Sequence, residues 1–507
     1  MGAIRWRPVF AVLCPARGPR RHRWRFVVVV VLVMLSACTA TGPADRATTG
    51  GPTTVRLEVG DRFDRVVANS PVGSTFVIAP GVHRRQFVAP RDGDVFVGED
   101  GAVVSGATVL DPAAFRPQGG LWVMEDRHEE PFRADNGQLH GAMEDGRARD
   151  AANHDLWVDD VRLQHVETLD DLDQAGEWYF DYGSDQLWLG ARPDESTPME
   201  LAVQPDFVRP TDAEDVSISN VTLRRFATPA QHGVIHAGGP RWTISDVAVE
   251  ESHGTGIVVG DDTVLEDSIV VDNGQLGVGA DGARGVVVRN TEVARNGQLG
   301  YLWAWEAGGL KFKDTADTRL EGNHVHDNHG PGIWYDLGNT AALVDGNRVE
   351  DNDVMGIFYE ISSDATIRDN EVLGNGHAEG IGTLGAGIFV SISFDVLIEG
   401  NITAGNNQEI VLVHADRREE IGEEYGVRDV VVRRNRVTID NDGSVGLYVD
   451  TDEDEYYTDR GNRFEDNTYV LDGCERCFLW EEPVDLATWQ ELGNDLGVNP
   501  EIRDGGP

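Results

Sequence analysis

Residues 320–325 (LEGNHV), 344–349 (VDGNRV) and 367–372 (IRDNEV) repeat one pattern, in which the first and last residues are apolar and the fourth is Asn. Related segments occur on both sides of these three, at residues 244–249, 265–270, 288–293, 398–403 and 432–437. Successive copies begin 21 to 34 residues apart, and a period of this length indicates a solenoid. Because apolar and polar residues alternate within each segment, the segments are predicted to be strands. The pattern therefore predicts an all-β protein, a parallel β-helix with two or three strands per coil.

A second strand recurs with the same period and begins at a Gly each time. Glycine is expected where a Cβ atom would clash with a neighbour or where φ is positive. Asn occupies the fourth position of the six-residue segment in successive coils, and we expect these side chains to hydrogen-bond along the solenoid axis. The glycines are Gly256, Gly277, Gly309, Gly332, Gly356, Gly387 and Gly446, and the Asn column is Asn323, Asn347, Asn370, Asn401 and Asn435.

The second strand is predicted to present two rows of side chains on its outer face. Positions two and four after the Gly point to the same side of a strand, opposite to Ile333 and Ile357, which must face the interior. The first row is Lys311, Trp334, Phe358, Phe389 and Tyr448, and the second is Asp281, Lys313, Asp336, Glu360, Ser391 and Asp450.

Lys313, Asp336 and Glu360 fall on three adjacent coils of the second row, at a strand spacing of roughly 4.8 Å. Two neighbouring carboxyls repel each other, which raises the pKa of one of them, and a nearby lysine opposes that shift. One carboxyl can then act as an acid while the other stays ionised. A carboxyl pair about 5–5.5 Å apart is typical of a retaining glycosidase. The catalytic candidates are Asp336, Glu360, Lys313 and Glu306.

Aromatic side chains near these rungs are candidate surfaces for sugar rings. The segment 301–309 (YLWAWEAGG) interrupts the repeat and is expected to wall one end of a groove. The predicted substrate-binding residues are Lys311, Trp334, Tyr335, Phe358, Tyr359, Trp303, Trp305, His326 and His329.

Other interpretations of the same residues remain open. Alternating acids and lysines also form ordinary ladders on a solvated sheet. Asp336 with Glu360 is a possible Ca²⁺ site, so a Ca²⁺ cofactor is kept as an option and no other cofactor is predicted. His324 and His326 share a strand face, but no third zinc ligand is evident.

The composition limits the class of partner. The chain has 507 residues, 43 Lys+Arg against 87 Asp+Glu, and a formal charge of −44, which disfavours nucleic acid and polyanionic glycans because of charge repulsion. Lys311 and Lys313 are the only lysines in the chain, and both fall on the predicted outer face. A polysaccharide or oligosaccharide is the expected partner, and a monomer the expected state.

The N-terminal segment has the features of an export signal. Residues 1–25 contain seven Arg and no acid, Phe26 to Leu35 is a short apolar run, and small residues precede Cys38. This arrangement resembles a bacterial lipoprotein signal peptide, which implies cleavage before Cys38 and lipidation of its thiol. The expected location is the outer face of the cytoplasmic membrane, with the lipid as the only membrane contact. Losing seven Arg lowers the formal charge from −44 to −51.

The chain divides into segments with different patterns. Residues 111–210 break the period and alternate like a small inserted antiparallel β-subdomain, whose Trp and Tyr residues form its core or a sugar platform. Phe478, Trp480 and Trp489 are expected to cover the open end of the solenoid. Cys474 and Cys477 are predicted to form a disulfide, because neither further zinc ligands nor a thioredoxin-like context is present. The segments are 1–37 signal peptide, 38–54 tether, 55–110 first coils, 111–210 inserted subdomain, 211–472 main coils and 473–507 C-terminal cap.

Four motifs carry a resemblance to a known group of proteins: residues 306–313 (EAGGLKFK), 326–336 (HDNHGPGIWYD), 356–360 (GIFYE) and 385–390 (GAGIFV). They resemble right-handed parallel β-helix proteins that bacteria secrete, related to β-helix glycoside hydrolases and polysaccharide lyases of the pectate-lyase-like superfamily. The resemblance spans roughly residues 55–490 and implies a right-handed helix with three sheets and a carbohydrate substrate.

The resemblance does not fix the reaction, because this fold hosts several chemistries. The leading hypothesis is a glycoside hydrolase that uses Asp336 and Glu360. The alternatives are a lyase with Lys311 or Lys313 as base and Ca²⁺ on acidic residues, and a non-catalytic glycan-binding or cell-envelope protein. The Tyr335–Asp336 rung and the negative charge both count against the lyase.

Overall fold

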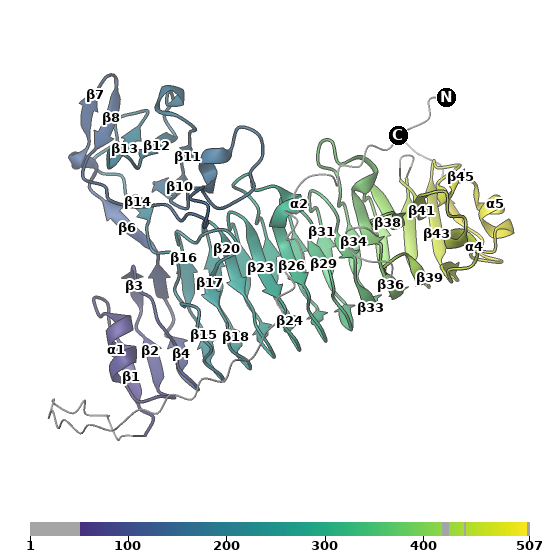
Figure 1. Ribbon diagram of the computed structural model, residues 1–507, viewed down its shortest axis with the longest axis horizontal. Coiled ribbons are helices and arrows are strands. Elements are labelled where there is room, and N and C mark those ends of the chain that lie inside the picture. Colours follow the sequence, from purple (N-terminus) through teal and green to yellow (C-terminus); the bar gives the residue numbers. More distant parts are fainter. Residues whose placement is uncertain (1–50, 418–424, 441–442, 504–507) are drawn as a thin grey trace, which may run out of the picture. The chain divides into compact units, whose positions relative to one another are not determined.

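The structure, a computed structural model, describes residues 51–417, 425–440 and 443–503 and confirms the predicted parallel β-helix (Figure 1). Three long sheets, named A, B and C here, run along the solenoid, as the resemblance implied. From β15 to β44 each coil adds one strand to each sheet, and these strands pair in parallel with their counterparts in the next coil. The predicted signal peptide and Cys38 lie outside the described residues.

The strands within each sheet follow in chain order. Sheet A contains β1 (Thr54–Leu57), β2 (Thr75–Ile78), β4 (Val95–Gly98), β15 (Ser217–Ser219), β18 (Thr243–Ser245), β21 (Val264–Glu266), β24 (Val287–Arg289), β27 (Arg319–Glu321), β30 (Ala342–Asp345), β33 (Ser363–Arg368), β36 (Phe394–Glu399), β39 (Arg428–Arg433) and β42 (Arg463–Glu465). Sheet B contains β3 (Gly81–Arg84), β5 (Ala102–Ser105), β16 (Thr222–Arg224), β19 (Ala248–Glu250), β22 (Ile269–Val271), β25 (Glu292–Ala294), β28 (His324–His326), β31 (Arg348–Glu350), β34 (Glu371–Leu373), β37 (Ile402–Ala404), β40 (Arg436–Ile439), β43 (Thr468–Asp472) and β46 (Glu501–Arg503). Sheet C contains β17 (Gly233–His236), β20 (Thr255–Val258), β23 (Leu276–Asp281), β26 (Gly308–Lys313), β29 (Ile333–Asp336), β32 (Ile357–Glu360), β35 (Ala386–Ser391), β38 (Gln408–Ala415), β41 (Val445–Asp450), β44 (Phe478–Trp480) and β45 (Glu482–Val484).

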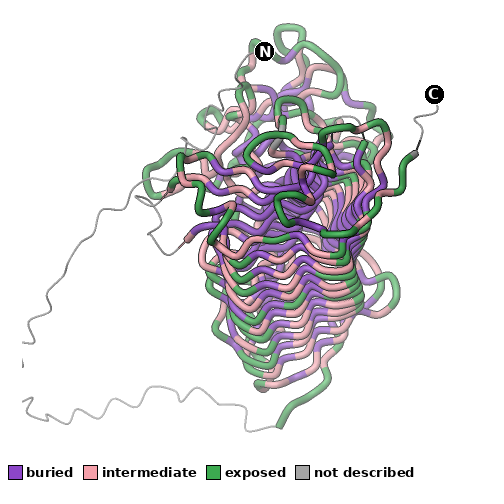
Figure 2. The backbone as a smooth tube through the Cα atoms, turned by 90° about the vertical axis from the view of Figure 1, so that its right-hand side faces the viewer, coloured by how far each residue is buried: buried purple, intermediate pink, exposed green. Residues whose placement is uncertain are grey.

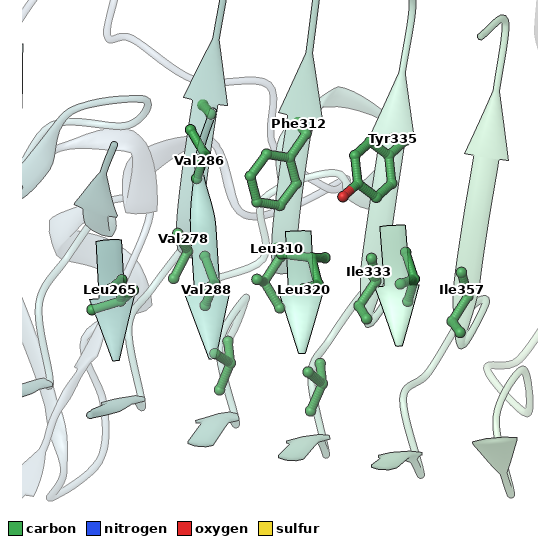
Figure 3. Close-up of a cluster of buried hydrophobic side chains, with 14 of the residues drawn as sticks. Leu265, Val278, Val286, Val288, Leu310, Phe312, Leu320, Ile333, Tyr335 and Ile357 are labelled. Carbon is green, nitrogen blue, oxygen red and sulfur yellow. The ribbon is translucent and has the colours of Figure 1, made fainter. Parts of the chain in front are cut away.

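Apolar side chains from all three sheets fill the interior of the solenoid. Leu310, Ile333 and Ile357 of sheet C point inward as predicted, and residues of sheet A such as Leu320 meet them there (Figure 3). Successive coils repeat the same alternation of buried and exposed positions (Figure 2). Because each rung buries only its inward face, the outward side chains are available for other contacts.

The predicted Asn column is confirmed as a buried hydrogen-bonded ladder. The Nδ2 of Asn347 donates to the Oδ1 of Asn370 in the next coil at 3.0 Å and to the carbonyl of Leu320 at 2.9 Å. A second ladder, not predicted from the sequence, lies at the following turn and contains Asn273, Asn296, Asn328, Asn352, Asn375 and Asn406.

The second Asn ladder explains the recurring glycines of sheet C. At Gly332, an added Cβ would lie 2.7 Å from the Nδ2 of Asn352 and 2.8 Å from the carbonyl oxygen of Gly356. Position 332 therefore requires glycine because Asn352 and the backbone of Gly356 approach it too closely for a side chain. Glu409, which follows the last Asn of the ladder, accepts hydrogen bonds from both nitrogens of Asn406. Burial raises the pKa of Glu409 to about 8.

The inserted subdomain forms two small sheets between β5 and β15. One sheet contains β10 (Val161–Arg162), β9 (Leu156–Val158), β14 (Met199–Ala202) and β6 (Ala107–Leu110), and the other contains β11 (Gln164–His165), β12 (Glu177–Asp181), β13 (Gln186–Leu189), β8 (Leu121–Met124) and β7 (Arg116–Gln118). The first strand, β6, begins before residue 111 because it pairs with β14 instead of continuing the solenoid. Trp157, Trp178 and Trp188 are buried, so they do not form a sugar platform.

Short helices and a hairpin complete the fold. Helix α1 (Phe63–Asn69) buries Phe63 and Val67 at the first coils. Helix α2 (Trp303–Glu306) lies before β26, and α4 (Glu455–Thr458) and α5 (Leu486–Glu491) lie near the C-terminus. Phe478, Trp480 and Trp489 pack into the end of the core, and the predicted disulfide between Cys474 and Cys477 is confirmed. None of the helices in the described part of the chain has the length and apolar character that crossing a bilayer requires.

Candidate active site

The outer face of sheet C carries the two predicted rows of side chains. The first row aligns as Lys311, Trp334, Phe358 and Phe389, and the second as Lys313, Asp336, Glu360 and Ser391.

The predicted alignment is wrong for the coil that contains β41. Ser444, not Gly446, takes the turn position there, because Val445 pairs with Ile410. Tyr448 therefore falls in the row of Glu360, two residues from its expected place.

The outer aromatic row is covered, not open to solvent. Trp334 and Phe358 stack with ring centroids 5.5 Å apart. Val354 and Met355, from the turn before β32, pack against them in a cluster separate from the main core. Phe358 is fully buried and Trp334 is 4% exposed, so neither presents the flat open surface that was expected for a sugar ring.

Tyr335 and Tyr359 point into the solenoid, which corrects their assignment as substrate-binding residues. Each lies one position after an outward aromatic residue, and successive side chains of a strand alternate between faces. Both are fully buried in the main core, where the ring of Tyr335 stacks on Phe312 (Figure 3). The hydroxyl of Tyr335 lies 2.9 Å from that of Thr318, and that of Tyr359 donates to the carbonyl of Ser363 at 2.6 Å.

Lys311 is the centre of a cluster of charges on this face. Its Nζ lies 3.0 Å from Oδ2 of Asp336, 3.6 Å from Oε1 of Glu306 and 3.7 Å from the centroid of the Trp334 ring. The Lys311 side chain is only 6% exposed, whereas those of Asp336 and Glu306 are 22% and 24% exposed. The two carboxylates therefore face solvent around a covered ammonium group.

Glu360 lies one rung beyond Asp336 and pairs with Arg417, whose Nη1 is 3.1 Å from its Oε1. Burial is the largest cause that raises the pKa of Glu360, and the negative charge of Asp336 adds to it. The charges of Arg417 and Lys311 act in the opposite direction, and the resulting pKa is about 7. Near neutral pH, Glu360 is thus a carboxyl that can donate or accept a proton.

Lys313 lies in the predicted row, but its side chain does not join this cluster. Its Nζ lies 3.3 Å from Asp281 on the preceding rung and 3.6 Å from Asp314. Burial lowers the pKa of Lys313, but these two carboxylates outweigh burial and raise it above its usual value. The ammonium stays protonated, which makes Lys313 a poor base.

Helix α2 supplies Glu306 to the cluster and places two Trp residues beside it. Trp303 packs partly buried near Trp334, with ring centroids 6.3 Å apart. Trp305 stacks on Tyr301 at 6.3 Å. Packing therefore holds both tryptophans of this segment in place.

The two predicted histidines pair with carboxylates other than Asp336 and Glu360. His326 is on β28 of sheet B, where it pairs with Glu292 and Asp327. His329 pairs with Asp353 and Glu144. The hydrogen bond that His329 donates to the Asp353 carboxylate is the main cause that raises the pKa of His329.

Arg417 is the functional candidate that the repeat pattern missed. It follows β38 in a segment without the Gly-anchored motif, so no periodic signal marks it. Within the described residues, no group of three or more His, Cys, Asp or Glu side chains is arranged to hold a metal ion.

Comparisons with known proteins agree with this architecture. Residues 232–403 match the family described as a right handed beta helix region. The structure of XylC in complex with xylose superposes with a TM-score of 0.64 at 14% identity, covering 84% of this chain and 82% of XylC. The A-module of the Azotobacter vinelandii mannuronan C-5 epimerase AlgE6 superposes with a TM-score of 0.51 at 14% identity, covering 88% of this chain and 93% of that module. No curated protein matches the chain in sequence.

The sheets and the family match define a right-handed parallel β-helix protein. On the outer face of sheet C it carries a charge cluster of Lys311, Asp336, Glu360, Glu306 and Arg417.

Proposed function

We propose that this protein is a carbohydrate-active enzyme, a glycoside hydrolase that acts on a neutral or weakly charged polysaccharide. The observation that carries the proposal is the pair of Asp336 and Glu360, in register on adjacent strands but in different surroundings. Asp336 is ion-paired with Lys311, whereas burial raises the pKa of Glu360 to about 7. A carboxyl that can donate a proton, beside a second carboxyl that is ion-paired, can supply the acid and the nucleophile of glycoside hydrolysis.

The catalytic roles of Glu360 and Asp336 follow from their different surroundings. Glu360 donates its proton to the glycosidic oxygen while the carboxylate of Asp336 attacks the anomeric carbon, so that a glycosyl ester forms as the glycosidic bond breaks. Glu360 then takes a proton from a water molecule, which attacks the anomeric carbon and releases Asp336. Strand spacing of about 4.8 Å between the two residues favours this retaining route over an inverting one.

The geometry supports a lyase less well. Lys311 is covered by Asp336, Glu306 and the Trp334 ring, and Lys313 stays protonated beside Asp281. Neither amine is placed as a free base for proton abstraction from a uronate.

A screen of the purified protein against soluble polysaccharides, read by mass spectrometry, tests the proposal. Release of new reducing ends supports hydrolysis. Products with an unsaturated, ultraviolet-absorbing ring would instead identify a lyase, and binding without turnover would identify a glycan-binding protein.

Replacing Arg417 by Met is expected to move the alkaline limb of the pH profile of kcat/KM upward by about one pH unit. Arg417 lowers the pKa of Glu360, and Glu360 must be protonated to act as an acid, so losing the guanidinium extends activity to higher pH. Arg348→Met is the control, because Arg348 lies on sheet B and pairs there with Glu350 and Glu371. An unchanged alkaline limb in Arg417→Met would contradict the role of Glu360.

The proposal also includes export and anchoring through a lipid on Cys38. We expect the N-terminal peptide of the protein purified from bacterial membranes to begin at Cys38 and to carry the mass of added acyl chains. An unmodified peptide that includes residues before Cys38 would contradict the anchor.

A further inference from the structure

A cavity of about 150 Å³ lies beside β17, the first strand of sheet C. Its walls include Phe132 from the inserted subdomain, three prolines, and the polar residues Asp206, His232 and His236. Since one water occupies about 30 Å³, the cavity has room for about five waters. This volume suits one ring of a larger ligand rather than a whole drug-sized molecule.

The lining of the cavity combines the apolar Phe132 and prolines with two histidines and the carboxyl group of Asp206. The Phe132 side chain is exposed, and its ring meets the edge of His232 at a centroid distance of 5.1 Å. Burial lowers the pKa of both His232 and His236, so each imidazole is neutral near pH 7 and has one donor and one acceptor nitrogen. The buried Nδ1 of His236 has no hydrogen-bond partner among the described residues.

Phe132 is held in place from the β-helix side. Its backbone N–H donates to the side-chain oxygen of Asn153 at 2.7 Å, and the Nδ2 of Asn153 donates to the carbonyl of Ala227 at 2.5 Å. Asn153 is itself buried. The wall formed by the inserted subdomain is therefore fixed relative to the coils before a ligand arrives.

A chain of side-chain contacts links the wall of the cavity to the charge cluster around Lys311. The ring of His140 contacts the edge of Phe132, and its Nε2 lies 3.1 Å from Oε1 of Gln231. The Nε2 of Gln231 donates to Glu306 at 2.7 Å, and Glu306 lies 3.6 Å from Lys311.

Strand register places the cavity on the same outer face as the cluster. His236 pairs with Val258, Val258 with Gly279, and Gly279 with Lys311. Three strand spacings correspond to about 14 Å along the solenoid axis. A glycan chain lying along sheet C would thus reach both places at once.

We propose that this cavity is a distal subsite that binds one uncharged sugar ring of the glycan held at Asp336 and Glu360. The apolar face of the ring lies on Phe132 and the prolines, and its hydroxyls bond to His232, His236 and Asp206. Among the residues that the structure describes, no lysine or arginine lines the cavity to recognise a carboxylate sugar. The subsite rests on the proposed function for its ligand class, and the inserted subdomain completes it.

The test is affinity gel electrophoresis in gels that contain soluble xylan, mannan, xyloglucan or mixed-linkage β-glucan. We expect at least one of these neutral glycans to retard the protein, and Phe132→Ala to weaken that retardation about tenfold, which corresponds to the loss of one stacking contact. Phe132→Tyr keeps the ring and should retain retardation. Val161→Ala removes another exposed apolar residue of the same subdomain, 62% exposed against 38% for Phe132, and serves as the control.

Steady-state kinetics of Phe132→Ala distinguish the loss of a binding subsite from a general effect on folding. Phe132→Ala is expected to raise KM about tenfold for polysaccharide, without changing kcat or the hydrolysis of the shortest substrates. Retardation of Phe132→Ala equal to that of the wild type would overturn the assignment, as would absence of retardation of the wild type in every gel. If retardation depends on Phe132 but no reducing ends are released, the subsite stands and the hydrolase proposal fails.

Discussion

Replacing Glu360 by Gln is expected to abolish nearly all release of reducing ends, with a loss of at least about 10²-fold in kcat. The amide cannot donate a proton to the leaving oxygen, while its size and buried position on β32 are retained. Asp336→Asn should reduce kcat by a similar or larger factor, because the amide cannot form the glycosyl ester. The measurement is the initial rate of reducing-end release on the best polysaccharide.

The matched control for Glu360→Gln is Glu371→Gln. Glu371 is a half-exposed carboxylate on β34 of sheet B, where it pairs with Arg348. This variant should keep the wild-type rate. Wild-type rates in both Glu360→Gln and Asp336→Asn would rule out the carboxyl pair as the catalytic centre, even if the protein hydrolyses glycans by other residues.

Replacing Asn352 by Ala is expected to destabilise the solenoid by at least about 3 kcal/mol. The Oδ1 of Asn352 accepts from the backbone N–H and the Nδ2 of Asn328, and its own Nδ2 donates to Val325 and Asn375. Asn352 is 1% exposed, so water cannot replace these bonds without a rearrangement of the turn. Each buried group left without a partner costs about 1–3 kcal/mol.

The effect on stability is measured by the thermal midpoint of unfolding at fixed pH. Asn69→Ala is the control, because Asn69 is exposed at the end of α1, where its side chain donates to the Arg65 carbonyl. We expect a clear fall in the midpoint for Asn352→Ala and almost none for Asn69→Ala. Equal midpoints for the two variants would show that the ladder contributes little.

The coil architecture could be predicted because the repeat imposes it many times over. The six-residue pattern, the Gly column and the Asn column each recur with one period, and a strand that buries one face allows only one register. The predicted alignment of the strands was wrong where the repeat itself changes. Glu409 and Ser444 take the positions that Gly holds in earlier coils.

The candidate site could be predicted only in part. Period-two alternation placed Asp336 and Glu360 on one outward row, and the same rule excludes Tyr335 and Tyr359 from that face. Alternation cannot show what covers a face, so the burial of Trp334 and Phe358 under Val354 and Met355 was not foreseen. Arg417 was not predicted, because its contact with Glu360 depends on the path of a segment outside the repeat.

The sequence by itself determined the solenoid, its period and the side of the sheet on which the charges lie, because local alternation and repetition carry that information. Only the tertiary structure decided which charges meet. Lys311 reaches Asp336 across one rung while Lys313 turns back to Asp281, since each flexible side chain pairs with the carboxylate that packing leaves within reach. Tertiary structure also brought Phe132 from the inserted subdomain to the first strand of sheet C, a contact between distant segments that no periodic pattern encodes.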